Sequence, residues 1–432
     1  MNALLDYSYT KHALGQTPAL DNALRKRIFI LSYSWTRNHY YYLVDLEEYT
    51  TKRWKVSYEN DYRQIVSEIE KSKNYEHIED VLDPINFSFV PHSSIMYEDK
   101  IYVFLVNALY FTVIDLKHNS ISQVYDDQRK MISSTNFIID NQLYYARYKI
   151  EDRIDNIRSN SSIPTELVKM DLTTKSTEVI SNFESNNIVH SVAVNRDKQW
   201  AVVISTTANP IVTFEEGKKN YTQDELKTML DKGLHNSQLH VFDLTGKVYH
   251  QILLANSPAH VESDMYDDNI FYISSHSLGV NPYDGFVYCF GEGAINKLIL
   301  KDTPQIIQSY AADDFSRLSS HKMFSEGNKQ YIAVTVFPQQ IHILDSDSMS
   351  VVSKIKLSKD AYTATLKNGA YKYPRVDKTP FSVHPVSDTP YLFLITGRGI
   401  VLYDRQRKEA IQSIIYNQTK DPIAVLGHSV VQ

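Results

Sequence analysis

Residues 340–357, QIHILDSDSMSVVSKIKL, carry the pattern that decides the fold. A mainly apolar run ends in Asp345, a polar turn follows, and a second run rich in Val and Ile returns along the first. Short runs with β-branched residues on either side of a polar turn predict two antiparallel strands. We therefore expect residues 340–357 to form a β-hairpin.

The same pattern recurs along the chain, at residues 40–46, 110–116, 167–172, 239–244 and 400–406 and, in a degenerate copy, at 286–293. The apolar run ends in Asp45, Asp115, Asp171, Asp243, Asp345 or Asp404, with Gly291 in the degenerate copy. Internal repeats of this length, each with four short strands, are typical of β-propellers. The sequence predicts an all-β, seven-bladed β-propeller that forms a single domain over residues 1–432.

The first blade lacks an obvious inner strand, because residues 1–26 form an extension with no strand pattern. The C-terminal run IAVLGHSVV, residues 423–431, is a suitable substitute. A ring that both chain ends complete leaves no open sheet edge. We expect the C-terminal strand to close the propeller.

Four long insertions interrupt the repeats, at residues 57–88, 149–164, 207–237 and 359–379. Short helices are expected in DYRQIVSEIEKSKN and in TQDELKTMLDKG, where Thr222 and Glu225 form a capping box and Gly233 a stop signal. These insertions are expected to cover one face. That face is typical either of a covered active site or of a protein-binding surface.

Composition excludes several classes of function. The chain has 432 residues, 43% of them hydrophobic, and a net charge of -6 with scattered basic residues, so nucleic acid is not the expected partner. The single cysteine, Cys289, excludes an internal disulfide and a cysteine-based metal site. No apolar run reaches membrane-spanning length, and the first residues are polar where a secretion signal would be apolar. We expect a cytoplasmic protein.

Six histidines stand near the start of the first strand of a repeat: His92, His190, His260, His321, His384 and His428. Asn136 takes the matching place in the remaining blade. In a closed ring these positions would converge, and several imidazoles would share one metal ion. The sequence therefore predicts a polyhistidine metal site.

Ligation by imidazole alone favours iron, copper or zinc over magnesium or calcium. Fe(II) is the expected metal, with copper or zinc as the alternatives. Carboxylates and one amide near the histidines are expected to orient the imidazoles from behind: Glu262, Asp264, Asp313, Asp314 and Asn136. In the competing interpretation the histidines only fix the blades or line the channel, as they do in many propellers.

Two resemblances sharpen these expectations. Residues 340–357 resemble the YVTN type of propeller repeat, which occurs in enzymes and binding proteins alike and implies the fold alone. Carotenoid cleavage oxygenases are seven-bladed propellers with an iron held by four histidines. Ala259 with His260 resembles the start of that family's first ligand motif, Gly427 with His428 resembles its last, and Val261 departs from the usual Pro.

The sequence thus predicts a metal-dependent oxidoreductase, in first place a non-haem Fe(II) oxygenase that acts on a small organic substrate with dioxygen. A second possibility is a non-catalytic propeller module that binds a protein on the loop-bearing face. A third is a copper–histidine redox centre similar to that of nitrous oxide reductase.

Overall fold

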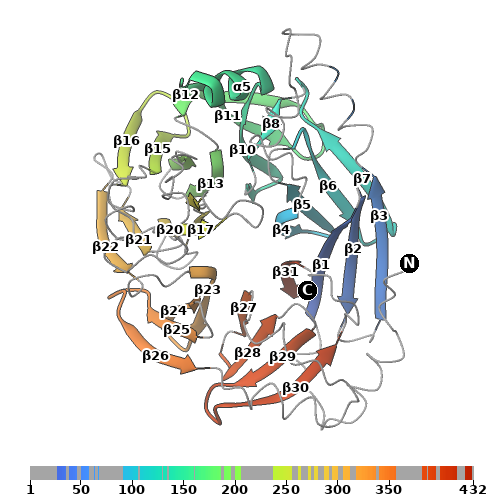
Figure 1. Ribbon diagram of the computed structural model, residues 1–432, viewed down its shortest axis with the longest axis vertical. Coiled ribbons are helices and arrows are strands. Elements are labelled where there is room, and N and C mark those ends of the chain that lie inside the picture. The colour runs from blue at the N-terminus through green and yellow to red at the C-terminus, as the bar shows by residue number, and fades with distance from the viewer. Residues whose placement is uncertain are drawn as a thin grey trace, which may run out of the picture. The chain divides into compact units, whose positions relative to one another are not determined.

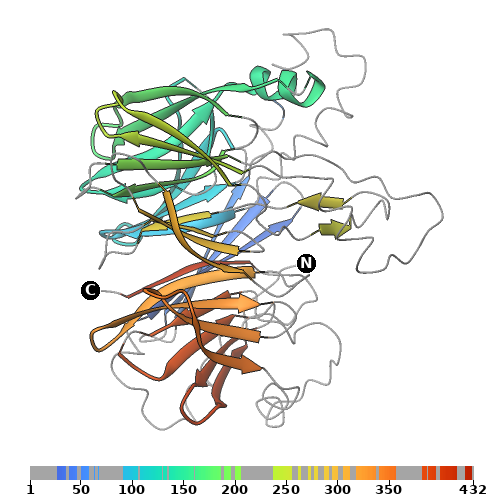
Figure 2. The same ribbon diagram turned by 90° about the vertical axis from the view of Figure 1, so that its left-hand side faces the viewer.

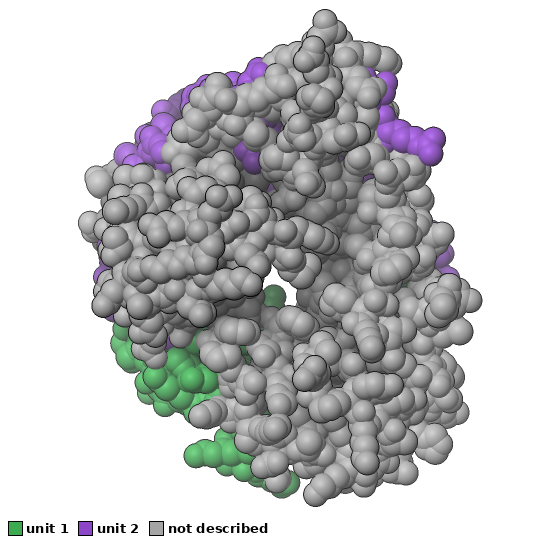
Figure 3. Space-filling view, viewed as in Figure 1, with its two compact units in different colours: residues 1–59, 316–432 green, residues 60–315 purple. Residues whose placement is uncertain are grey.

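The computed structural model describes residues 27–35, 38–45, 50–57, 63, 67, 91–105, 108–128, 130–133, 136–159, 161–185, 189–195, 200–205, 237–254, 261–263, 271–273, 277–280, 287–290, 294–299, 305–311, 318–336, 340–356, 382–386, 388–395, 399–415 and 424–430. The chain divides into two compact units (Figure 3). Unit 1 comprises residues 1–59 and 316–432, and unit 2 comprises residues 60–315.

Unit 2 contains three four-stranded antiparallel sheets of consecutive strands (Figure 1). The first is β4 (Pro91–Tyr97), β5 (Lys100–Leu105), β6 (Tyr110–Asp115) and β7 (Ser120–Tyr125). The second is β13 (Val189–Asn195), β14 (Trp200–Ser205), β15 (Ser237–Asp243) and β16 (Tyr249–Leu254). The third is β19 (Ser277–Val280), β20 (Val287–Phe290), β21 (Ala294–Ile299) and β22 (Gln305–Ala311). A separate two-stranded ladder joins β17 (Val261–Ser263) to β18 (Phe271–Ile273).

A fifth strand distinguishes the other large sheet of unit 2. It comprises β8 (Met131–Ile132), β9 (Phe137–Ile139), β10 (Gln142–Tyr148), β11 (Ile163–Asp171) and β12 (Thr177–Ser185). Both short strands pair with β10, so the edge position is divided between them. The helix α5 (Ile150–Ser159) connects β10 to β11.

Unit 1 contains three four-stranded sheets. Two consist of consecutive strands: β23 (Leu318–Glu326), β24 (Lys329–Val336), β25 (Gln340–Asp345) and β26 (Val351–Lys356), then β27 (Ser382–Pro385), β28 (Tyr391–Ile395), β29 (Gly399–Asp404) and β30 (Glu409–Ile415). The last joins β1 (Arg27–Trp35), β2 (Asn38–Asp45) and β3 (Thr50–Ser57) to β31 (Ala424–Val430). Because β31 pairs antiparallel with β1, the predicted C-terminal closing strand is confirmed.

The prediction of a β-propeller is confirmed, but the predicted number of seven blades is wrong. Within the described ranges, five sheets are regular blades in which four consecutive strands form an antiparallel meander. Two other sheets depart from this pattern, one through the divided edge strand of β8 and β9 and one because it is completed from the C-terminus. The repeated hairpin specifies the third and fourth strands of a sheet, whereas the first strand, at the opposite edge, depends on more distant parts of the chain.

Sheets that are consecutive along the chain pack face to face within each unit, in a β-propeller arrangement (Figures 1 and 2). In unit 2, for example, Phe104 and Phe111 share a buried cluster with Leu143 and Val168 of the next sheet. In unit 1, Ile343 packs in one cluster with residues of β28. The middle strands β5 and β6 are buried at nearly every position, which is why they appear in the sequence as continuous apolar runs.

The repeated aspartates stabilise the turn between the third and fourth strands of a sheet. Asp171 Oδ1 accepts hydrogen bonds from the backbone N–H groups of Thr173 at 2.9 Å and Thr174 at 2.8 Å. Asp345 and Asp404 do the same in their own turns. Four of these turns place the fourth residue after the Asp at positive φ, namely Asn119, Lys175, Met349 and Lys408. The Asp therefore stabilises the turn. It recurs because the same turn recurs in several sheets, and the repetition does not indicate a catalytic or binding role.

Replacing Asp345 with alanine is expected to lower the free energy of unfolding by about 1–2 kcal/mol, because the N–H groups of Asp347 and Ser348 lose a charged acceptor. Hydrogen bonds, first those from Ser348, hold the pKa of Asp345 below its ordinary value of 3.8. A lowered pKa means that this stabilisation is present above the unfolded-state pKa and is lost as the pH falls through the folded-state value. The difference between wild type and variant in urea unfolding should therefore begin to shrink below about pH 3.8 and disappear below the lower, folded-state pKa. The control is Asp99→Ala in the exposed β4–β5 turn; an equal loss there would contradict the turn role.

The predicted insertions are described only in part. Residues 150–159 of the 149–164 insertion form α5. The extension 1–26 and the insertions 207–236 and 359–379 lie outside the described residues, as does most of 57–88, where Arg63 and Ser67 are helical. The helical cover expected over one face is thus not observed in the described part of the chain. No helix in that part is both long and apolar enough to cross a bilayer.

Candidate functional site

Five of the six predicted histidines lie on edge strands of their sheets. His92 is on β4, His190 on β13, His321 on β23, His384 on β27 and His428 on β31. His260 lies outside the described residues. The sequence pattern therefore predicted the right strand for each histidine that the structure describes.

The pairing register shows that these histidines are not all equivalent. In each sheet, one residue of the second strand pairs with the turn Asp, and we call it the anchor residue of that sheet. His92 and His190 each lie in a β-bulge. The residue before each histidine pairs with the fifth residue after the anchor residue, and the residue after it pairs with the fourth. His321 faces Val334, three residues after its anchor residue, and His384 faces Phe393, two residues after its own.

His428 faces Phe29, one residue after Ile28, the anchor residue that pairs with Asp45. Since a strand rises about 3.3 Å per residue, the five positions spread over roughly 10 Å along their strands. The equivalence inferred from sequence spacing holds only for His92 and His190. The bulges in β4, β13 and β23 shift the register by one residue, and no sequence pattern marks them.

His384 is the one predicted ligand whose side chain is described, and it is 1% exposed. It lies on the opposite face of β27 from Val383, which belongs to the buried cluster with β28. In the described part of the chain, no three or more His, Cys, Asp or Glu side chains gather as a metal would require. The predicted polyhistidine site thus remains a prediction.

The structure describes only some of the residues that were expected to orient the imidazoles of the predicted ligands. Asn136 is 3% exposed and forms hydrogen bonds with Ser133, through Nδ2 to the backbone carbonyl at 2.9 Å and through Oδ1 to the hydroxyl. Both polar atoms of this amide are therefore used within its own loop. Glu262 is on β17, where its side chain is not described, and Asp264, Asp313 and Asp314 lie outside the described residues.

Two histidines that the sequence did not single out are buried within sheets. His240 on β15 is fully buried, with Nε2 2.9 Å from Ser205 Oγ and Nδ1 2.9 Å from Tyr249 Oη. Burial lowers the pKa of His240 to about 4, so the imidazole is neutral near pH 7. His342 has the same register on β25, since each faces the residue three positions after the anchor residue of its sheet. Both stand three residues before the turn Asp, the signal that would have identified them.

A buried ionic cluster in unit 2 centres on Arg147 of β10. Its guanidinium contacts Asp126 Oδ2 at 2.6 Å and Glu166 Oε2 at 2.7 Å and also pairs with Asp127. The side chains of Arg147 and Asp126 are 1% and 0% exposed. Asp126 accepts a further hydrogen bond from Tyr145 Oη at 2.7 Å. Since β7 precedes Asp126, this cluster fixes the connection between two sheets.

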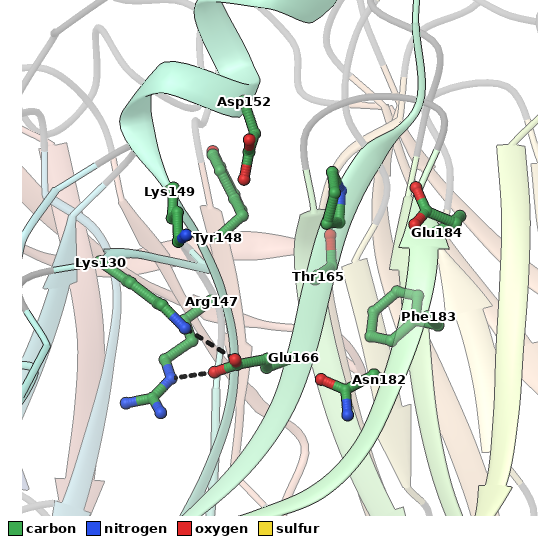
Figure 4. Close-up of a pocket in the computed structure, with 11 residues that line it drawn as sticks. Lys130, Arg147, Tyr148, Lys149, Asp152, Thr165, Glu166, Asn182, Phe183 and Glu184 are labelled. Carbon is green, nitrogen blue, oxygen red and sulfur yellow. Dashed lines mark hydrogen bonds and ion pairs between the residues drawn. The ribbon is translucent and has the colours of Figure 1, made fainter. Parts of the chain in front are cut away.

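A cavity of about 450 Å³ opens beside this cluster (Figure 4). The first turn of α5 and strands β10, β11 and β12 supply most of its lining. Lys130 and Arg147 both donate to Glu166 at its base, and Asp152 projects from α5. Burial raises the pKa of Glu166, but the hydrogen bonds from Lys130 and Arg147 outweigh it and leave the pKa lowered. The carboxylate is therefore ionised.

No family model and no curated protein sequence matches the chain. The resemblance to carotenoid cleavage oxygenases thus gains no support. One solved structure, from an analysis of two prolyl endopeptidases, is 11% identical with a TM-score of 0.40; the match covers 97% of this chain but only 53% of that one. Apo AztD from Citrobacter koseri is 13% identical with a TM-score of 0.44, covering 92% of this chain and 83% of its own. These likenesses are too distant to carry a functional argument.

Proposed function

We propose that the chain is a metal-dependent oxidoreductase, in first place a non-haem Fe(II) oxygenase, whose metal is bound by histidines on the edge strands of its sheets. One observation supports this proposal above the others. His321, His384 and His428 belong to the same compact unit, and each lies on the edge strand of a different sheet.

Three imidazoles suit this role chemically. Neutral nitrogen ligands leave the ion its full positive charge and leave coordination positions open for substrate. Iron, when bound, would supply redox chemistry with dioxygen that side chains lack. The protein's own contribution would be to hold the imidazoles and keep water out, and the burial of His384 is consistent with that.

Metal analysis of protein purified without a histidine tag tests this function. We expect close to one equivalent of iron, copper or zinc after anaerobic loading and desalting. His321→Ala and His428→Ala should each abolish retention. His118→Ala is the matched control, because the His118 side chain is 69% exposed in a turn of unit 2. Circular dichroism confirms that each variant folds, and absence of bound metal in the folded wild type would refute the proposal.

A propeller module without catalysis is the second candidate, and His240 favours it. That imidazole is buried, neutral and hydrogen-bonded on both nitrogens inside a sheet, so at least one histidine here has a structural role. If the edge-strand histidines act in the same way, their removal lowers the melting temperature while no metal is retained by any form of the protein. The metal analysis therefore separates the two candidates.

A further inference from the structure

The cavity beside α5 is lined by a lysine, Lys130, whose ammonium is only partly used in hydrogen bonding. The Lys130 side chain is 10% exposed, and its ammonium contacts Glu166 Oε1 at 2.7 Å. The backbone N–H of Lys130 donates to Asp126, which fixes the residue at the cavity. An ammonium carries three N–H donors, and within the described residues Glu166 is the single acceptor for Lys130. Two donors of a nine-tenths buried cation thus remain for a ligand.

The cavity also offers an unused anion. Asp152, in the first turn of α5, forms no hydrogen bond or ion pair with any residue in the described part of the chain. Burial raises its pKa, and Lys149 only partly opposes this. A carboxylate that is partly removed from water and unpaired gains most from a cationic or hydrogen-donating partner. Asp152 is therefore complementary to an ammonium group.

From these two groups we propose that the cavity binds a small zwitterion of the α-amino acid class, with its carboxylate on Lys130 and its ammonium on Asp152. This site is independent of the proposed metal centre. The cavity volume of about 450 Å³ lies in the range of about 300–1,000 Å³ that is usual for small-ligand sites. The buried Phe183 ring supplies an apolar wall for the ligand's side chain.

The balance of charge in the lining favours a zwitterion over a simple ion. Three cations and three carboxylates line the cavity: Lys130, Arg147, Lys149, Asp152, Glu166 and Glu184. A phosphate or another polyanion would be repelled by the three carboxylates, and a simple cation would be repelled by the three cationic side chains. Arg147 and Glu166 already satisfy each other at 2.7 Å, which leaves Lys130 and Asp152 as the recognition pair.

The test is calorimetric titration of the full chain with each standard L-amino acid singly. We expect at least one to bind. Its N-acetyl derivative, which lacks the ammonium, and its amide, which lacks the carboxylate, should each bind at least about tenfold more weakly. Lys130→Met and Asp152→Asn should reduce affinity for the parent amino acid at least about tenfold.

Glu151→Gln is the matched control for Asp152, because it removes an acidic side chain from the same turn outside the cavity lining. If Lys130→Met does not fold, Lys130→Arg is the second variant at this position. It keeps the positive charge and should keep most of the affinity. Two outcomes would overturn the proposal: no amino acid binds the folded wild type, or binding is unchanged in both Lys130→Met and Asp152→Asn.

Discussion

Arg147→Met is expected to lower the free energy of unfolding by about 3–5 kcal/mol, the cost of leaving a buried charge without its partner. Asp126, which is 0% exposed, would keep only the hydroxyl of Tyr145 and nearby backbone groups as partners. Glu166 would keep Lys130 alone. Chemical unfolding followed by circular dichroism measures the loss.

Lys169→Met is the control for Arg147. Lys169 pairs with Glu178 at 2.8 Å, but the two side chains are 31% and 68% exposed, so we expect a loss below about 1 kcal/mol. Arg147→Lys should recover part of the stability, because it keeps the charge but not the planar fork that reaches several carboxylates. A loss in Arg147→Met no larger than that in Lys169→Met would show that the cluster does not stabilise the fold.

Gly246→Ala is the second substitution with a large expected effect. Gly246 follows the turn Asp243 with φ of 71°, a conformation that costs a side-chain-bearing residue about 1–2 kcal/mol. An added Cβ would stand 2.1 Å from the backbone oxygen of Ile180, a contact that only a backbone shift relieves. Overpacking of this kind typically adds about 1–3 kcal/mol. We expect a total loss of about 2–5 kcal/mol, measured by urea unfolding.

Gly327→Ala separates the two contributions. Gly327 also has positive φ, 57°, but no atom lies within 4 Å of an added Cβ. It should therefore show the conformational cost alone, about 1–2 kcal/mol. If Gly246→Ala costs no more than Gly327→Ala, the close approach of the β15–β16 turn to β12 is not part of the folded structure.

The sequence predicted the parts of the fold that depend on local pattern. The Asp at the end of each third strand specifies its turn through hydrogen bonds within a few residues, and residues 340–357 form β25, β26 and the turn between them as expected. The β31 strand was also predictable, because residues 27–57 supply three strands and the C-terminus one more. The departure of one sheet from a regular meander was not predictable, since the division of its edge strand into β8 and β9 depends on pairing with β10.

The candidate sites were predictable to a smaller extent. The strands that carry His92, His190, His321, His384 and His428 followed from the repeat, but the pairing register shows that the histidines lie at different distances from the anchor residues of their sheets. Nothing local marks the partners of Arg147, because Asp126 and Glu166 lie 21 and 19 residues away along the chain. A charged residue within the strand sequence QLYYARY was the available signal. The cavity arises from the position of α5 over β11, which no motif encodes.

X-ray absorption at the metal edge, on tag-free protein loaded anaerobically with Fe(II), tests the proposed histidine-bound metal most directly. We expect a first shell with at least three nitrogen ligands and the outer-shell scattering of imidazole rings, at metal–nitrogen distances near about 2.0–2.2 Å. In His321→Ala the imidazole contribution should fall by one ring or the metal should be lost. A first shell of oxygen alone, or a wild-type protein that retains no metal, would contradict the proposed metal site.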